Sequence, residues 1–460
     1  MGIEKHRTSV CRRHLPPALN VALVHTRVVT PAHQSGKTME KPASPAPRRV
    51  VVTGYGAICS LGQNADAIWD AMMDYQIGYR LHRFDDPTIH ARFFGFIDEF
   101  GREAMRPFSK KISKMLPLFA KYSLVAANEA LHMAYGDTPL DDVVAPFDRG
   151  VVLGTGWGGL DTANFNNNEY CQQGISTSFA TVMSMCNAGT AAITMNWNMR
   201  GVQNSPVAAC ATGTIAIGEA YEAIRAGRAK MMIAGGSESL KEQFNVWSID
   251  VIQALSKEQE NPRLACCPFS KGRSGFILSE GAAVLCLEDY ELAKARGAKI
   301  LGEITGYANY SDAFDMTAPA EDMQARVRVI QEVCRQASVD APHIDYINLH
   351  GTSTPLNDVN EARSIKLALG DAAHGIPMSS TKSYTGHLIG AAGSMEAIFC
   401  LKAMARGTIP ATIHLDEADP ECDLNFVPNE HLHGQRLENV LNLSFGFGGA
   451  NAGIMLRKVQ

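Results

Sequence analysis

Short runs of apolar, often β-branched residues recur along the chain and are bounded by glycine or polar turn residues. The first opens the segment RRVVVTGYGAICSLG at Arg48. Five more follow, at residues 150–153, 230–236, 282–287, 346–349 and 441–445. Uninterrupted apolar runs of this length are typical of strands buried on both faces of a sheet. The pattern therefore predicts six buried strands.

Segments with a helical spacing of apolar residues separate several of these runs, for example residues 116–133 and 214–226. Strands that alternate with helices indicate an α/β protein whose sheets are covered by helices. We predict two strand-and-helix sets, one in residues 48–300 and one in residues 301–460, although they share no clear sequence repeat. A chain of 460 residues is long enough for two domains or one large double unit.

The first 47 residues differ in composition from the rest. They are rich in Arg, Lys, Pro and Ser, and their acidic residues are Glu4 and Glu40. Three interpretations stay open: a disordered extension, a natural start at Met39, and an organellar transit peptide, since such peptides are Arg-rich and poor in acidic residues. We expect a cytoplasmic protein, or an organellar one if residues 1–47 are a transit peptide.

Charge and cysteine content argue against several classes of function. The net charge of −5 gives no basic excess for nucleic acid, and no apolar run is long enough to span a membrane. Eleven scattered cysteines without a close CxxC pair suit a reducing compartment. Cys266 and Cys267 are adjacent, and neighbours rarely bind one tetrahedral zinc together. We therefore predict no metal and no cofactor.

The glycine-rich segment GTGWGGL follows a predicted strand and places Gly154, Gly156 and Gly159 in a GxGxxG spacing. In a dinucleotide site this motif opens a helix. Here Asp161 and the polar run 164–168 follow, without the apolar periodicity of a helix. We therefore expect no nucleotide site at this turn.

Cys210 lies in SPVAACATGTIAIGEAYEAIRAG, where apolar residues lead to the cysteine and an amphipathic helix extends to about Arg225. A cysteine at the N-terminal end of a helix lies near the positive end of the helix dipole, which favours the thiolate. The small residues after it allow a carbonyl group to approach the backbone N–H groups. Cys210 is therefore a candidate nucleophile, although a small buried structural cysteine is the commoner role for this residue type.

Two histidines and a lysine lie in similar positions at the ends of predicted strands. His350 closes the strand in DYINLHGTSTPLND, and His387 follows Lys382 in SSTKSYTGHLIGAAGSME, with Glu396 one helical segment later. A histidine at a strand end that faces a loop is well placed for catalysis, although each one alone could be structural. The tail segment NLSFGFGGANAG exposes backbone N–H groups that could complete an oxyanion hole.

These segments occur in the order and context of the elongating β-ketoacyl-[acyl-carrier-protein] synthases, and from residue 48 to the end the chain most resembles the synthase II type. The resemblance implies a thiolase-like fold, in which two similar α/β halves form five αβαβα layers. It also implies a homodimer that works with acyl carrier protein and its phosphopantetheine arm. The expected reaction is decarboxylative condensation of an acyl group on Cys210 with malonyl-carrier protein, which extends a fatty acid chain.

The resemblance also assigns a role to each candidate residue. The catalytic set is Cys210, His350 and His387 with Lys382, and the supporting glutamates are Glu396, which pairs with Lys382, and Glu361. The N–H of Phe447, a gating residue, forms the oxyanion hole with that of Cys210. The remaining candidates bind substrate: Thr352 and Thr354 at the phosphopantetheine arm, Phe445 in the tail motif, and Trp157 and Ile249 in the acyl pocket.

The chain departs from the family pattern at several positions. Ser270 and Ser274 replace two aspartates in PFSKGRSGF, which puts the local ion pairs of that segment in question. Ala450 replaces a threonine, and Asp315 replaces a frequent histidine.

In the acyl pocket, Trp157 stands where a smaller apolar residue is usual, and Ile249 stands where phenylalanine is frequent. Trp157 could shorten the acyl chain that fits, or the two changes could compensate each other with no net effect. Both interpretations stay open from the sequence.

Three rival functions differ in their sequence requirements. A non-catalytic chain-length factor or scaffold lacks the active-site cysteine, whereas Cys210 is present here. A thiolase carries a second catalytic cysteine near the C-terminus, and the tail SFGFGGAN has none. A ketosynthase of a polyketide or other specialised acyl pathway uses the same residues, so this alternative stays open.

Overall fold

The computed structural model describes residues 47–98 and 100–459, so the predictions for residues 1–46 lie outside the described part of the chain. All six predicted strands are present, as β1 (Val50–Cys59), β4 (Arg149–Gly154), β6 (Met231–Glu238), β8 (Gly281–Asp289), β10 (Tyr346–Asn348) and β14 (Asn439–Gly446). The two predicted helices are α3 (Leu118–Tyr135) and α7 (Thr212–Arg225). The predicted α/β class is therefore confirmed.

Four further strands complete a continuous sheet: β5 (Gln203–Asn204), β9 (Gly302–Ser311), β11 (Met378–Ser379) and β15 (Ala450–Arg457). The order is β11-β10-β14-β15-β9-β1-β8-β6-β4-β5. On each side of the central antiparallel β9–β1 pair, two antiparallel pairings are followed by parallel ones. The strand pattern thus repeats although the sequence does not.

Alternating side chains of the strands enter different apolar clusters. In β8, Ala283, Leu285 and Leu287 face a central cluster, whereas Ala282, Val284 and Cys286 face an outer one. This period of two is the side-chain geometry of a strand buried on both faces.

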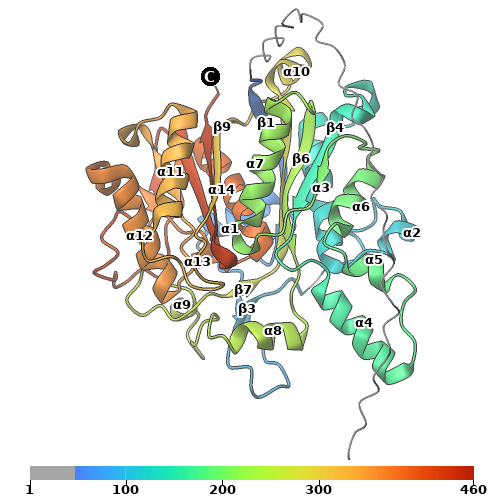
Figure 1. Ribbon diagram of the computed structural model, residues 1–460, viewed down its shortest axis with the longest axis horizontal. Helices are drawn as coiled ribbons and strands as arrows, with labels where there is room; N and C mark the ends of the chain where they lie inside the picture. The colour runs from blue at the N-terminus through green and yellow to red at the C-terminus, as the bar shows by residue number, and fades with distance from the viewer. Residues whose placement is uncertain (1–46, 99, 460) are drawn as a thin grey trace, which may run out of the picture. The chain divides into compact units, whose positions relative to one another are not determined.

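Three clusters between helices and strands give the layers. The central cluster holds α7 and α14 (Ala392–Arg406), one outer cluster holds α3 and α6 (Ala188–Asn196), and the other holds α11 (Gln324–Ala337) and α12 (Pro355–Leu369). Figure 1 shows α11 and α12 on one side, α3 and α6 on the other, and α7 with α14 between the strands. The two halves of the sheet lie on either side of α7 and α14, and each half has further helices on its outer face. The layers therefore alternate as αβαβα.

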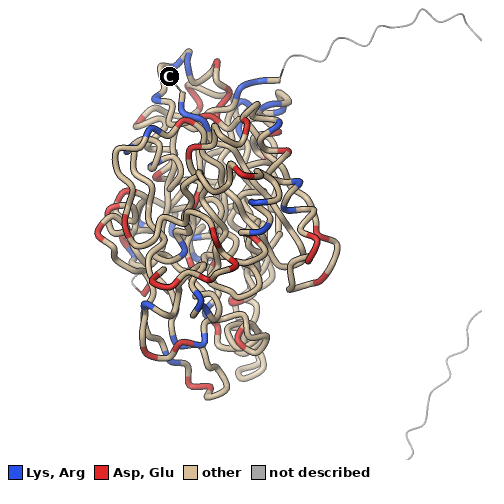
Figure 2. The backbone as a smooth tube through the Cα atoms, turned by 90° about the vertical axis from the view of Figure 1, so that its left-hand side faces the viewer, with Lys and Arg blue, Asp and Glu red and all other residues tan. Residues whose placement is uncertain are grey.

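The remaining elements are short or peripheral. The helices are α1 (Ala65–Met73), α2 (Lys110–Ser113), α4 (Leu160–Gln173), α5 (Ala180–Ser184), α8 (Gln243–Asp250), α9 (Pro262–Ala265), α10 (Tyr290–Ala295) and α13 (Lys382–Thr385). The strands are β2 (Arg80–Leu81), β3 (Phe93–Gly95), β7 (Leu278–Ser279), β12 (Thr408–Ile409) and β13 (Leu432–His433). Within the described residues, no helix combines the length and apolarity needed to cross a membrane. Figure 2 shows basic and acidic residues interspersed along the described backbone.

The segment after GTGWGGL corrects one expectation. The polar run 164–168 lies inside the helix α4, and Asn166 is the only buried residue of this helix. A helix that buries so little has no apolar periodicity, so its sequence pattern gave no sign of it.

Candidate active site

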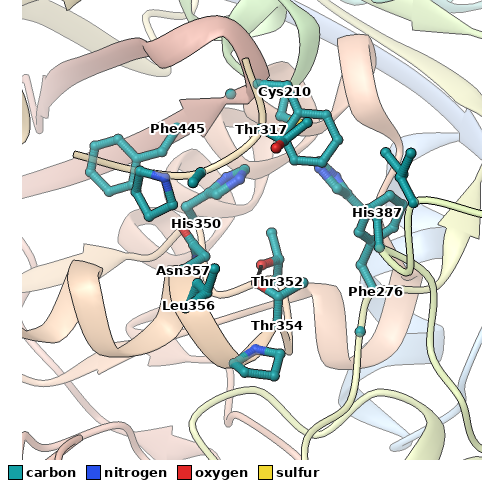
Figure 3. Close-up of a pocket in the computed structure, with 18 of the residues that line it drawn as sticks. Cys210, Phe276, Thr317, His350, Thr352, Thr354, Leu356, Asn357, His387 and Phe445 are labelled. Atoms are coloured by element: carbon teal, nitrogen blue, oxygen red, sulfur yellow. Dashed lines mark hydrogen bonds between the residues drawn. The ribbon is translucent and has the colours of Figure 1, made fainter. Parts of the chain in front are cut away.

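Cys210 lies in a 3₁₀ turn, η3 (Ala209–Ala211), immediately before α7. Its side chain is buried, and it lines the cavity shown in Figure 3. The preceding Ala209 has a φ of +45°, a left-handed conformation that strains a residue with a Cβ atom. Strain of this kind is found where the surrounding structure holds a functional side chain in place.

Burial is the largest influence on the protonation of the sulfur, and its effect differs from the sequence-based expectation of a thiolate. Loss of hydration raises the pKa of the Cys210 thiol to about 12, although Lys382 and the N–H groups of Phe447 and Cys210 itself act to lower it. The resting residue is therefore a thiol near neutral pH.

Alkylation by iodoacetamide tests this protonation state. Because the thiolate is the nucleophile, we expect the alkylation rate of Cys210 to rise about tenfold per pH unit from pH 6 to 9, without a plateau. Mass spectrometry of the Cys210 peptide measures the rate, and the exposed Cys171 reports on reagent quality in the same sample. A plateau below pH 8 would mean that a stable thiolate forms, as the helix argument predicted.

The two histidines converge on Cys210 from different elements. His350 follows β10 by two residues, and His387 lies between α13 and the 3₁₀ turn η6 (Ile389–Ala391). The ring centroids are 5.3 Å apart, and the sulfur and one nitrogen of each ring lie within 4.8 Å of one another. The structure therefore brings together the catalytic set that the sequence predicted.

Hydrogen bonds to Nδ1 define the tautomer of each ring. The N–H of Ile389 donates to Nδ1 of His387 over 3.3 Å, and the ammonium of Lys382 lies 3.4 Å from Nδ1 of His350. Burial, together with the charge of Lys382, holds the pKa of both histidines well below the usual value, so both rings are neutral. With Nδ1 acting as acceptor, the proton of each ring lies on Nε2. Each histidine therefore offers one Nε2–H donor.

Buried charges hold this arrangement in place. Lys382 forms an ion pair with Glu396 of α14 and donates to the main-chain oxygen of His350 over 2.6 Å. Glu361 of α12 accepts the N–H groups of His350 and Gly351, each over 2.7 Å. Burial raises the pKa of the Glu396 and Glu361 carboxyl groups to about 7. Glu396 thus supports the catalytic set through Lys382 and Glu361 through the main chain of His350, and neither glutamate lines the cavity.

The loop after β14 approaches the turn of Cys210 closely. A Cβ atom at Gly446 would lie 2.9 Å from the oxygen of Ala208 and 3.1 Å from the nitrogen of Cys210, so a side chain there would push the two segments apart. Because glycine permits this approach, the N–H of Phe447 points at the sulfur of Cys210. The two N–H groups predicted for an oxyanion hole therefore lie on one side of the sulfur.

A cavity of about 300 Å³ contains these groups. Thr352 and Thr354 line it, and their hydroxyl groups are 2.8 Å apart. Phe445 of β14 and Phe447 also line it. Figure 3 shows the two threonines below the histidine rings and Phe445 beside His350.

Trp157 and Ile249 lie elsewhere, on the apolar side of Cys210. Neither residue lines the cavity, but both belong to an apolar cluster that also contains Cys210 and Phe276. Ile249 is buried in α8, and Trp157 is partly buried between β4 and α4. The predicted acyl-pocket residues therefore share an apolar cluster with the nucleophile but do not line the cavity that holds the threonines.

Two departures from the family pattern have structural answers. Arg273 forms an ion pair with Asp419 at 2.7 Å and lies 3.6 Å from Asp358, so other acids replace the missing aspartates near it. Asp315 is exposed and accepts the N–H groups of Thr317 and Ala318, so it stabilises a surface turn.

Sequence reasoning missed two buried charged residues at the site. Glu238 ends β6 and accepts the N–H groups of Gly156 and Gly390. Arg326 lines the cavity from α11. Its position could have been found, because Arg326, Val329, Ile330, Val333 and Ala337 have the spacing of one helix face and are all buried.

The sulfur and the two imidazoles are also suitable ligands for a soft metal ion such as zinc. The expectation of no metal and no cofactor therefore stays a prediction, which metal analysis of the purified protein would test.

Comparisons with known proteins agree with this geometry. Residues 47–293 match the family model for the β-ketoacyl synthase N-terminal domain, and residues 301–416 match that for the C-terminal domain. Proteins named 3-oxoacyl-[acyl-carrier-protein] synthase 2 from Synechocystis and Vibrio harveyi are 37% and 36% identical to this chain, over 90% of it and 99% of each relative.

Solved structures support the same assignment. A β-ketoacyl synthase from Burkholderia phymatum superposes with a TM-score of 0.82 at 32% identity, over 90% of this chain and all (100%) of its own. A type II polyketide ketosynthase, solved with its acyl-carrier protein, superposes with a TM-score of 0.82 at 30% identity and the same coverage. These matches confirm the thiolase-like fold that the motifs implied. The chain belongs to the β-ketoacyl synthase family.

Proposed function

We propose that this condensing enzyme joins an acyl group carried on Cys210 to a malonyl unit carried on acyl carrier protein, and so extends a fatty acid chain. The observation that carries the proposal is the convergence of one buried sulfur with two neutral Nε2–H donors in a single cavity. In this assignment residues 48–300 supply the nucleophile and residues 301–460 supply both histidines.

The first half of the reaction transfers the acyl group. The sulfur of Cys210 attacks the thioester carbonyl, and the N–H groups of Cys210 and Phe447 stabilise the oxyanion. The bond to the carrier sulfur breaks, and that sulfur takes up the proton that Cys210 releases. A thioester on Cys210 results.

The second half forms the carbon–carbon bond. Malonyl-carrier protein loses carbon dioxide, and the electron pair of the broken bond moves into the thioester carbonyl. The Nε2–H groups of His350 and His387 donate to the enolate oxygen without protonating its carbon, since neutral imidazoles are weak acids. The enolate carbon then attacks the acyl group, and 3-oxoacyl-carrier protein forms. The sulfur of Cys210 leaves as a thiolate and takes up a proton from solvent, which restores the thiol.

The carrier protein places its phosphopantetheine arm along Thr352 and Thr354, the hydroxyl pair of the cavity. The hydroxyl pair in the cavity supports acyl carrier protein as the partner, and a ketosynthase relative has been solved with one. We further propose that the enzyme is a homodimer in a reducing compartment, the cytoplasm or an organelle. Size-exclusion chromatography with light scattering tests the dimer.

Incubation with a panel of acyl-carrier proteins, followed by malonyl-carrier protein, tests the reaction. Mass spectrometry is expected to show an acyl adduct on Cys210 and then a product two carbons longer on the carrier. No adduct from any donor would contradict the proposal.

The alternative, a polyketide ketosynthase, has the support of the polyketide relative with a TM-score of 0.82. The same panel separates the two functions. A polyketide enzyme condenses a 3-oxoacyl chain again without reduction, whereas an elongation enzyme waits for a reduced chain. A single condensation with malonyl-carrier protein in excess is the expected result.

Trp157 is expected to limit acyl chain length, because it shares an apolar cluster with Cys210. Trp157→Ile should increase turnover of the longest acyl chains about tenfold over wild type, since each buried methylene contributes about 0.8 kcal/mol. A ladder of acyl-carrier proteins of rising chain length measures the effect. Ile249→Phe on the wild-type background is the matched opposite change and should shorten the preference. Equal use of long chains by wild type and Trp157→Ile would support compensated packing of Trp157 and Ile249, with no net effect on chain length.

A further inference from the structure

Arg326 is a cation in the catalytic cavity that has no ion-pair or hydrogen-bond partner for its side chain within the described residues. It lies in the first turn of α11, lines the cavity and is 4% exposed. Its Nε and Nη1 atoms are buried and make no hydrogen bond to any described residue. Because a buried guanidinium without acceptors is unfavourable, an acceptor from outside the chain would stabilise it.

The carboxylates that interact electrostatically with Arg326 accept hydrogen bonds from other groups. Glu361, Asp312 and Asp358 raise the pKa of the guanidinium, but burial is the larger effect and lowers it to about 10, so Arg326 stays charged near neutral pH. None of the three forms an ion pair with it. Their oxygens accept hydrogen bonds from His350 and Gly351 (to Glu361), from Asn451 and Ala320 (to Asp312), and from Thr352 and Phe269 (to Asp358).

The ring of Phe445 fixes the direction of the guanidinium. The Cζ atom of Arg326 lies 4.2 Å from the ring centroid, and the same ring is 5.9 Å from that of His350. The charge of Arg326 also lowers the pKa of His350. Arg326 is therefore held on the wall of the cavity that carries one of the enolate-binding histidines.

We propose that Arg326 binds the free carboxylate of the malonyl-type extender unit before that carboxylate is lost. This inference rests on the proposed condensation. A planar guanidinium matches a carboxylate, and its unpaired N–H groups supply charge-assisted hydrogen bonds. In the proposed reaction the acyl chain carries no charge and is assigned to the apolar cluster with Trp157, so it offers the guanidinium no acceptor.

The chemistry limits what Arg326 contributes. When the bond between the carboxylate carbon and the α-carbon breaks, the negative charge moves to the enolate oxygen at the histidines, and neutral carbon dioxide leaves. Arg326 then has no anion to hold. It therefore strengthens binding of the extender more than it lowers the barrier of decarboxylation, and acts as a positioning residue for that substrate.

Binding of two non-transferable analogues tests this. In malonyl- and acetyl-phosphopantetheine amides, an amide replaces the thioester and only the first compound has a carboxylate. Wild type is expected to bind the malonyl amide about tenfold to a hundredfold more tightly than the acetyl amide, and Arg326→Gln to abolish the difference. Arg326→Lys should keep part of it. Arg328→Gln, an exposed change two residues later on α11, should keep all of it.

Kinetics supply the second measurement. Arg326→Gln should raise KM for malonyl-carrier protein by a similar factor with little change in kcat, and the rate of acyl transfer to Cys210 should equal that of wild type. If Arg326→Gln keeps the malonyl preference, the inference is wrong although the enzyme still condenses. If binding of both phosphopantetheine amides weakens equally, Arg326 holds the phosphate and not the carboxylate. Absence of any Cys210 adduct in wild type would contradict the proposed function itself.

Discussion

Replacement of Cys210 by alanine is expected to abolish condensation, by a factor on the order of 10⁴ or more, because no other cysteine among the described residues lines the cavity to carry the acyl group. The variant should fold, since alanine fits where the buried thiol lies and the cost is about 1 kcal/mol. Loss of the acyl adduct in intact-mass spectra and of 3-oxoacyl product measures the effect. Cys171→Ala, an exposed change, is the control and should be fully active.

The same variant separates the two halves of the reaction. Both Nε2–H donors remain in Cys210→Ala, so decarboxylation of malonyl-carrier protein to acetyl-carrier protein should continue slowly without an acyl acceptor. His387→Ala removes one donor, and we expect loss of decarboxylation with retention of the acyl adduct. The opposite pattern would reverse the roles assigned to the sulfur and the imidazole.

The catalytic set could be predicted from the sequence because each member lies in a short motif of fixed local structure. Cys210 precedes α7, His350 follows β10 and His387 precedes α14, as the strand and helix patterns indicated. What these patterns do not contain is the balance of solvation. The position of Cys210 before a helix predicted a thiolate, but burial of the sulfur raises the pKa of the thiol and keeps the proton on it.

Long-range packing accounts for the parts that the sequence did not reveal. The strand β15 begins inside a glycine-rich segment. It pairs with β14, which directly precedes it in the sequence, and with β9, which lies far earlier in the chain. Arg326 lies among charged residues of α11 that are typical of a solvent face, and only its place in the helix period marks it as buried. The tautomers of both imidazoles depend on Lys382 and Ile389, which contact them only in the folded chain.

Lys382→Met is expected to lower the free energy of unfolding by about 3–5 kcal/mol, because it leaves the buried Glu396 without the cation that compensates its charge. The two side chains are 2% and 3% exposed, so water does not screen their ion pair. Removing both charges, in Lys382→Met with Glu396→Leu, should restore most of the lost stability, since apolar side chains of similar volume replace a buried ion pair with little cost. Urea titrations of the three proteins measure the differences.

Activity should not follow stability in this series. The double variant still lacks the ammonium that holds Nδ1 of His350 as an acceptor. The proton of that ring can then move from Nε2 to Nδ1, so that Nε2 no longer donates a hydrogen bond to the enolate oxygen. We therefore expect condensation to fall about a hundredfold. Lys402→Met is the matched control. Lys402 lies in α14, the helix of Glu396, and is also buried, but it pairs with the exposed Asp66 and does not line the cavity. It should lose some stability and keep its activity. A double variant that regains both stability and activity would show that Lys382 only balances the charge of Glu396, and that another group fixes the tautomer of His350.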